Sequence, residues 1–424
     1  MAQKRYLLII WRHLFLFILA RHLHKPVIIE SLTSIFRGFT TTSRGLIILR
    51  VWIRFIMFYI SQGSRMLNNK LFMLIIINRS FLYRIFMADN IFLFYVLFEI
   101  CLMPIFFIII GWGYQPERLS ARYFIVLYTI IRTMLLLIFL LNYSSQLSIF
   151  RFELLAELNL RTKIINNSQI IFLLILTLGL FTKFPIYLFH VWLPRAHLEA
   201  PVIGSVLLAA VLLKLAGFGL WKFRSIILQD FGQFFIIFRI LGGSLIGIVC
   251  ILEKDIKKLI AYSSVAHMAF IIRNYLNKRS LSAKGGLLFI YRHGTCSSML
   301  FIGRFVIYLK RHSRRMYFNY RYLRVIPIFR RLWCFSCLCR IGIPPTRNFF
   351  REIFCIIGVI GLSNYYILPV CLLSYMAAVY SLILYSNTQR GQLEKFRIND
   401  ELRINYYIIF IYFLFWRFFI FYIL

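Results

Sequence analysis

Acidic residues are scarce in this sequence, with 14 Asp and Glu among 424 residues. Charged residues of both signs make up 15% of the chain, whereas soluble proteins carry about 25%. Hydrophobic residues reach 61%, and the mean hydropathy is +0.78. The apolar runs also lack the period-two alternation of a membrane β-barrel. These features exclude a soluble domain and predict an all-α polytopic membrane protein with about 13 to 14 transmembrane helices.

Two further absences narrow the class of protein. No small-residue cleavage site follows the apolar N-terminal segment, so we interpret that segment as a mature helix rather than a signal peptide. Cys334, Cys337 and Cys339 have a spacing that could suit a soft metal, but no second group of ligands lies near them in the sequence. We therefore predict that these cysteines pack between helices and that the chain holds no metal.

Two lysines, Lys183 and Lys214, lie within segments apolar enough for the bilayer interior. A lysine there costs roughly 2.5–3.5 kcal/mol on insertion scales, so it is seldom kept without a function. Helix breakers accompany both lysines, with Pro185 after the first and Gly217 after the second. Broken helices that carry ionisable groups at membrane depth are typical of ion and proton paths.

Two of the acidic residues, Glu99 and Glu352, fall well inside apolar segments, and Glu352 follows a Pro344-Pro345 break. A buried carboxylate must be paired, hydrated or protonated, so Glu99 and Lys183 are the natural first pair. The alternative is a static ion pair that only holds helices together. Four such groups, each beside a helix break or a proline, favour a conduction role.

Four histidines extend this pattern. His190 and His197 flank a Trp-Leu-Pro sequence, and His267 and His293 lie in later apolar segments. Imidazole titrates near physiological pH, so it can relay protons between lysines. A hydrogen-bonded packing role is the alternative for each of them. We interpret all four as candidate relay groups, and His267 and His293 are the better candidates because they lie deeper.

Several motif blocks follow one another between residues 91 and 390. They are Phe94–Pro104, Trp112–Arg118, His190–Pro201, Ala261–Met268, His293–Ser298, Ile343–Glu352 and Tyr380–Leu382. In this order they resemble the NADH dehydrogenase subunit 4 family, the antiporter-like proton-pumping subunits of mitochondrial respiratory complex I. Residues 1–90 match that family only loosely.

The resemblance implies an antiporter-like fold with two inverted repeats, residues 91–222 and 223–386, each containing a discontinuous helix. N-terminal transmembrane helices in 1–90 would precede the repeats, and a loop and helix in 387–424 would follow them. By analogy Glu99 and Lys183 form a coupling pair, Lys214 is the central relay lysine, and Glu352 is the terminal carboxylate of the exit half-channel.

The same resemblance implies that the chain itself has no cofactor. NADH, FMN, iron–sulfur clusters and ubiquinone would bind to other subunits of an NADH:ubiquinone oxidoreductase. The partners would be other membrane-arm subunits, including neighbouring antiporter-like subunits, and membrane lipids. The location would be the mitochondrial inner membrane, which the chain would cross many times.

The net charge of +36, with 36 Arg against 14 Lys, does not suit this family. Arg132, Arg292 and Arg351 stand where the family usually has serine or another small residue. We hypothesise that many intramembrane arginines are serine in the native protein, because several invertebrate mitochondrial codes translate AGA and AGG as serine. Arg118 and Arg195 occupy motif positions that carry a basic residue, and we expect them to be arginine.

Two other functions compete with the complex I subunit. A subunit of a multi-subunit cation/proton antiporter shares the lysine and glutamate blocks, and a non-conducting scaffold would leave four intramembrane ionisable groups without a purpose. Nucleic-acid binding is excluded, because the basic residues are scattered through apolar spans rather than gathered on a soluble face.

Overall fold

The computed structural model describes residues 69–389 except 114–115, 148–150, 153–166, 224–231, 276–279, 320–326, 345, 347 and 361–363, together with residues 407 and 410. The N-terminal residues 1–68, and nearly all of the predicted loop and helix in 387–424, lie outside the described residues. The predicted total of 13 to 14 spans therefore stays a prediction.

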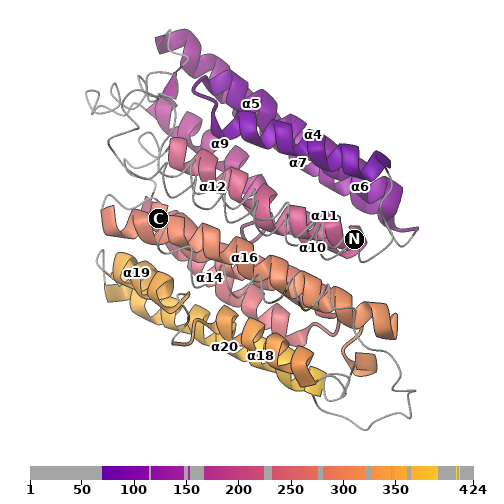
Figure 1. The fold of residues 1–424 in the computed structure, drawn as a ribbon. Helices are drawn as coiled ribbons and strands as arrows, with labels where there is room; N and C mark the ends of the chain where they lie inside the picture. The colour runs from indigo at the N-terminus through magenta and orange to yellow at the C-terminus, as the bar shows by residue number, and fades with distance from the viewer. Residues whose placement is uncertain are drawn as a thin grey trace, which may run out of the picture.

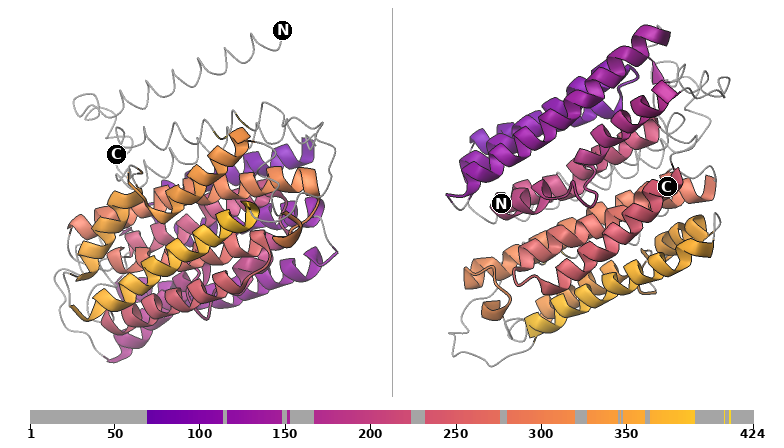
Figure 2. Two further views of the ribbon diagram at one scale, coloured as in Figure 1. Left: turned by 90° about the horizontal axis from the view of Figure 1, so that it is seen from below. Right: turned by 180° about the vertical axis from the view of Figure 1, so that it is seen from behind.

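The described part of the chain is built from helices, without strands. Helices lie side by side along one common direction, and Figures 1 and 2 show an earlier group and a later group of helices packed against each other. The earlier group comprises α4 (Asn69–Phe86), α5 (Ile91–Ile100), α6 (Leu102–Trp112), α7 (Arg118–Leu147), α9 (Asn167–Lys183), α10 (Trp192–Glu199), α11 (Val202–Leu207), the π-helical turn η1 (Leu208–Leu212) and α12 (Leu213–Lys222). The later group comprises α14 (Gly232–Leu252), α15 (Ile256–Tyr275), α16 (Ser280–Arg311), the 3₁₀ turn η2 (Tyr317–Asn319), α18 (Pro327–Ile341), α19 (Asn348–Ile360), the 3₁₀ turn η3 (Asn364–Tyr366) and α20 (Ile367–Gln389).

Four helical stretches among the described residues are long and apolar enough to cross a membrane. They are Ile91–Trp112, Arg118–Asn142, Val202–Lys222 and Ile367–Gln389. The most apolar window of Val202–Lys222 is buried along its whole length, whereas the windows of Arg118–Asn142 and Ile367–Gln389 are only 33% buried. The stretch that carries Lys214 is thus surrounded by protein, and the other two present apolar side chains to the outside, as lipid-facing helices do.

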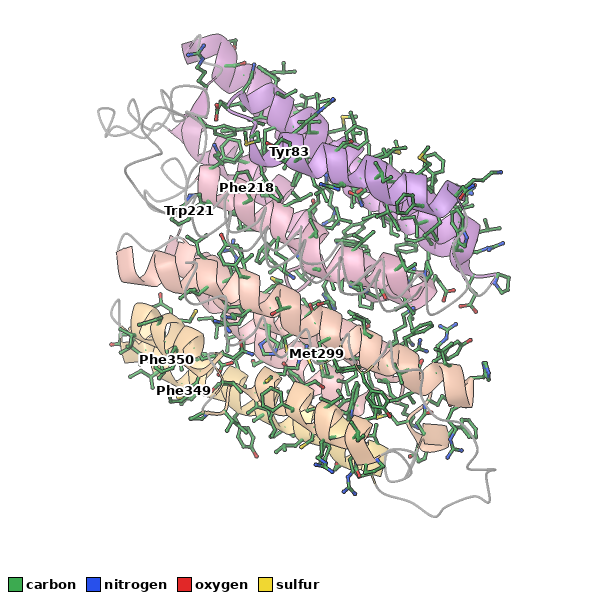
Figure 3. All side chains as sticks on the ribbon, viewed as in Figure 1. Tyr83, Phe218, Trp221, Met299, Phe349 and Phe350 are labelled. Atoms are coloured by element: carbon green, nitrogen blue, oxygen red, sulfur yellow. The ribbon has the colours of Figure 1, made fainter. Side chains whose placement is uncertain are left out.

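The two groups of helices meet along α10, α11 and η1 on one side and α15 and α16 on the other. Gly217 permits a close approach there, because a Cβ atom at this position would lie 2.6 Å from Cδ1 of Ile290 on α16. Apolar side chains fill the spaces between the helices, and Figure 3 labels the buried Phe218 of α12 and Met299 of α16 among them. The interface between the groups is therefore part of one continuous apolar core.

Within the described ranges two helices are discontinuous, as the predicted antiporter-like fold class requires. The first is α9–α10, where α9 ends at Lys183 and non-helical residues 184–191 precede α10. Pro185, which the sequence marks as a helix breaker, lies in this interruption, because proline cannot continue a helix. The second is α18–α19, which is interrupted after Ile341, where Gly342 has a φ of +82° and Pro344 lies outside any helix.

The arginines within the helices occupy contrasting environments. Arg79 and Arg84 on α4 are exposed. Others are buried with 2–4% of their surface exposed; these are Arg239, Arg292, Arg304 and Arg340. Desolvating a guanidinium inside a membrane bundle is costly, whereas serine is a common small residue at contacts between membrane helices. The buried positions are therefore the ones at which serine would relieve the largest penalty.

We expect peptides of the native subunit to carry serine at positions 132, 292 and 351. Tandem mass spectrometry of the purified subunit measures this directly, and the codons of the gene provide a second check. Arg118 and Arg195 are the internal controls, since both should remain arginine. Arginine at 292 and 351, or CGN codons there, would reject the hypothesis.

Candidate functional site

A buried ion pair joins α5 to α9. The Nζ atom of Lys183 lies 2.8 Å from Oε1 of Glu99 and donates a second hydrogen bond, 2.7 Å long, to the backbone oxygen of Phe98. The same Nζ atom sits 3.7 Å from the centre of the Phe98 ring. Lys183 is 5% exposed in its side chain and Glu99 is 21% exposed, so the glutamate faces the edge of the site and the lysine its interior.

Local structure holds this pair in place. Asn90 caps the start of α5 by accepting a hydrogen bond from the Phe92 N–H. Lys183 is the last residue of α9, and the indole N–H of Trp192 donates a 2.8 Å hydrogen bond to the backbone oxygen of Thr182. This bond ties the start of α10 back to the end of α9 and satisfies a carbonyl group that the interrupted helix leaves exposed.

Lys214 is fully buried and is the second residue of α12, which follows the π-helical turn η1. The Leu213 N–H reaches back five residues to the oxygen of Leu208, which is the hydrogen bond that defines a π-helix. The Nζ atom of Lys214 donates to the backbone oxygen of Ala209 and lies 3.1 Å from Nδ1 of His293 on α16. The π turn thus aims the lysine across the interface between the two groups of helices.

The polar contacts continue from His293 into the later group. The rings of His293 and His267 have centroids 5.8 Å apart, and Nε2 of His267 lies 3.0 Å from the Tyr380 hydroxyl. These side chains come from α16, α15 and α20, and all of them are buried. A row of groups that can bind and release protons therefore leads from Lys214 toward α20.

Glu352 lies in the first turns of α19, beside the break between α18 and α19. Its carboxylate packs against Gly342, where a Cβ atom would stand 2.7 Å from Oε2. The Asn348 amide bridges the same break by donating to the backbone oxygen of Cys339. The absence of a side chain at Gly342 is what leaves room for the carboxylate at the break.

Comparison of the sequence with known proteins identifies the family to which the chain belongs. Residues 88–377 match the family described as NADH:quinone oxidoreductase/Mrp antiporter, TM. The chain belongs to this family. A curated relative named NADH-ubiquinone oxidoreductase chain 4, from Rhipicephalus sanguineus, is 36% identical over 381 residues, which cover 89% of this chain and 85% of the relative. The predicted resemblance and the predicted class of proton-translocating membrane subunit are confirmed.

Solved structures of the family share the fold. A chain of respiratory complex I from Thermus thermophilus superimposes with a TM-score of 0.77 at 21% identity, covering 89% of this chain and 80% of that one. A chain of the Mrp complex from a Dietzia species gives 0.75 at 14% identity, covering 84% and 67%. The all-α, antiporter-like fold class is thereby confirmed.

The two earlier candidate histidines lie apart from this row. His190 is half-buried in the non-helical segment after α9, with its ring stacked on Tyr187. His197 is fully buried on α10 and stacks on Phe301 with a ring separation of 4.6 Å. Its ring nitrogens have no hydrogen-bond partner among the described residues. The structure therefore joins His293 to Lys214 by a direct contact and places His267 beside His293, whereas His190 and His197 stack on aromatic rings.

Two polar residues of the interior were not singled out from the sequence. Lys257, at the start of α15, is 2% exposed and donates hydrogen bonds of 2.8 and 2.7 Å to the backbone oxygens of Leu198 and Ala200. It caps the end of α10, although its position in a charged run suggests a surface lysine. Tyr380 belongs to a motif block, but nothing in its sequence surroundings points to a histidine 113 residues away.

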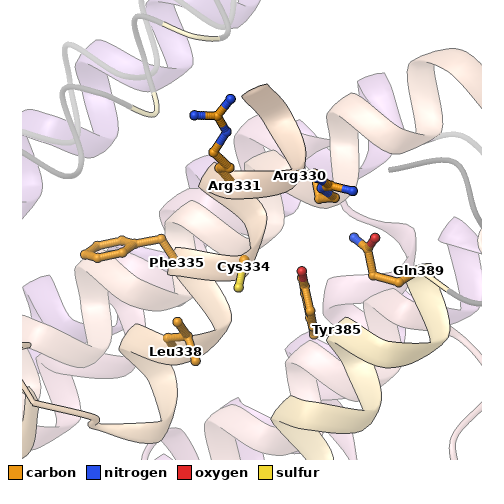
Figure 4. A pocket seen from close by; sticks show the side chains of 7 residues that line it. All are labelled: Arg330, Arg331, Cys334, Phe335, Leu338, Tyr385 and Gln389. Carbon is orange, nitrogen blue, oxygen red and sulfur yellow. The ribbon is translucent and has the colours of Figure 1, made fainter. Parts of the chain in front are cut away.

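An open cavity of 360 Å³ lies between α18 and α20, away from this row of groups (Figure 4). Its lining consists of Arg330, Arg331, Cys334, Phe335, Leu338, Tyr385 and Gln389. Cys337 and Cys339 of the predicted cysteine cluster are buried on α18. Within the described ranges, His, Cys, Asp and Glu side chains form no group of three that could hold a metal ion.

Proposed function

We propose that this chain is a membrane-arm subunit of mitochondrial NADH:ubiquinone oxidoreductase, and that it moves protons along a buried axis. The axis comprises Glu99, Lys183, Lys214, His293, His267 and Glu352. The observation that carries the proposal is the 3.1 Å contact between Lys214 Nζ and His293 Nδ1, made inside the fully buried centre of the bundle. A lysine that stands against an imidazole has a neighbour that can accept its proton.

The ion pair supplies the coupling step of this proposal. While Glu99 stands against Lys183, its negative charge stabilises the ammonium in a medium of low dielectric. When a movement in a neighbouring subunit draws the carboxylate away, the ammonium loses this stabilisation and gives up its proton toward Lys214. The proton then passes to His293 and His267 and on to Glu352, beside the break in α18–α19. Quinone reduction elsewhere in the complex drives the movement.

The remaining partners follow from this assignment. NADH, FMN, iron–sulfur clusters and ubiquinone belong to other subunits, and neighbouring antiporter-like subunits stand at the ends of the axis. The partly exposed apolar surfaces of α7 and α20 suit contact with lipid chains in the inner membrane. His190 and His197 stay candidate relay groups at the side of the first broken helix.

Co-purification tests the assembly and its alternative. Solubilised mitochondrial membranes, fractionated with an antibody against this chain, should yield a particle that contains flavin and iron–sulfur clusters and oxidises NADH. An unrelated inner-membrane protein serves as the control for carry-over. Recovery in a flavin-free particle with cation/proton exchange activity would favour the multi-subunit antiporter instead.

His293→Leu tests the proposed route within the assembled complex. Leucine fills a similar volume but cannot accept a proton, so NADH-driven proton translocation should fall by about tenfold or more. NADH oxidation by an artificial acceptor, which bypasses the membrane arm, should be unchanged. His312→Leu is the matched control, because His312 lies in the loop after α16. Normal translocation in His293→Leu would contradict the route.

A further inference from the structure

Tyr380 occupies an unusual position for a tyrosine in an apolar bundle. It lies near the middle of α20 and is 1% exposed. Its hydroxyl is 3.0 Å from Nε2 of His267, and the two rings meet edge to face with centroids 6.1 Å apart. A buried phenol normally has a hydrogen-bond partner, and the partner of Tyr380 is His267, the last imidazole of the proposed axis.

Tyr380 also lies near the end of α18, which precedes the break in α18–α19. The guanidinium carbon of Arg340, on α18, lies 5.8 Å from the centre of the Tyr380 ring. The guanidinium also donates a hydrogen bond to the Ser263 hydroxyl on α15. Two residues later, just past the end of α18, Gly342 packs against the Glu352 carboxylate. Tyr380 therefore contacts His267 on α15 and the end of α18, and the break that follows α18 holds the Glu352 carboxylate.

We propose that the Tyr380 hydroxyl is a proton-relay group between His267 and Glu352. The inference rests on the proposed axis and adds a residue to it. A hydroxyl is both a donor and an acceptor, so it can take a proton while passing on its own. The N–H bond at His267 Nε2 breaks as a new O–H bond forms at Tyr380, and the original O–H proton moves to the Glu352 carboxylate. Tyr380 remains neutral throughout, and rotation of its hydroxyl restores the starting hydrogen bond.

The relay does not depend on a guanidinium at residue 340. The bond between the Tyr380 hydroxyl and His267 involves no atom of residue 340. The relay requires only the phenolic oxygen, and that requirement is what separates it from a packing role.

The test compares three variants within the intact complex. Tyr380→Phe keeps the ring and removes the oxygen, and Tyr380→His sacrifices packing but restores a protonatable group. Tyr385→Phe is the control: it also removes a tyrosine hydroxyl from α20, but at the α18–α20 cavity (Figure 4). Proton translocation per NADH is measured in sealed vesicles. NADH oxidation by an artificial acceptor and the amount of assembled complex report on integrity.

We expect Tyr380→Phe to lower translocation by about tenfold or more, Tyr380→His to recover part of it, and Tyr385→Phe to match the wild type. Wild-type translocation in Tyr380→Phe would mean that the ring serves packing alone, and the relay would be overturned. Lys214→Met, measured in parallel, separates the two proposals. If Lys214→Met loses translocation while Tyr380→Phe translocates protons at the wild-type level, the relay alone is rejected. If both variants translocate protons at the wild-type level, the axis is rejected as well.

Discussion

Lys214→Met is expected to abolish proton movement through this chain while the complex still assembles. Methionine is about as long as lysine and suits the fully buried position, so the packing of α12 against α16 should survive. The substitution removes a buried ammonium, and replacing a buried charge by an apolar group of similar volume is often neutral or stabilising. What is lost is the group that contacts His293 and that the proposed axis places between His293 and the ion pair.

The expected magnitude is a fall of about a hundredfold in translocation through this subunit, the scale of a missing acid–base group. It is measured as NADH-driven acidification in sealed vesicles, with NADH oxidation by an artificial acceptor as the assembly check. Lys222→Met is the matched control. Lys222 lies on the same helix, α12, but at its last residue, 3.9 Å from the half-exposed Asp89. Equal losses in both variants would show that the effect is not specific to the axis.

Glu99→Gln is expected to affect both stability and coupling. The amide leaves the Lys183 ammonium buried against neutral groups, and breaking a buried pair in this way costs about 3–5 kcal/mol. A variant in which Lys183 is also replaced, Glu99→Gln with Lys183→Met, removes both charges and should regain much of that stability. Neither variant should translocate protons normally, because the coupling step needs a carboxylate that can stabilise an ammonium.

Thermal inactivation of the complex measures the first effect, and translocation per NADH measures the second. The double variant decides between the interpretations left open by the sequence. Recovery of both heat stability and translocation would mean that the pair is a static tie between helices. Recovery of heat stability alone is the result expected of a coupling pair. Glu117→Gln, outside the buried pair in the turn before α7, is the control.

The axis was partly predictable from the sequence, and the reason differs from residue to residue. Glu99 and Lys183 are conspicuous because charges inside apolar segments are rare. A buried charge needs a partner of opposite sign, so the presence of one residue predicts the pairing with the other. The break before Glu352 was equally visible, since two adjacent prolines cannot lie within a regular helix. The proline break is a local feature of the sequence, and the ion pair follows from the small number of charged residues inside apolar segments.

The contacts between helices were not predictable in this way. Lys214 and His293 are 79 residues apart, and only the packing of α12 and η1 against α16 brings them together. Helix periodicity gives the face on which a residue lies, but not the neighbour opposite. The capping role of Lys257 was hidden for the same reason, because its acceptors lie 57 and 59 residues earlier in the chain. Histidine alone also says little, as the contrast between His293 and His190 shows.

The π turn before Lys214 has a consequence for how this lysine is aimed. A regular α-helix rotates by about 100° per residue. The turn η1 closes with a hydrogen bond five residues long instead of four, so it rotates by a smaller angle per residue. The direction of Lys214 therefore depends on how many residues precede it in the turn, and hardly on which apolar residues they are. Leu208–Leu212 should accept exchanges of one aliphatic side chain for another. A change in the length of this segment would instead rotate the lysine away from His293 and divide the row of groups at its centre.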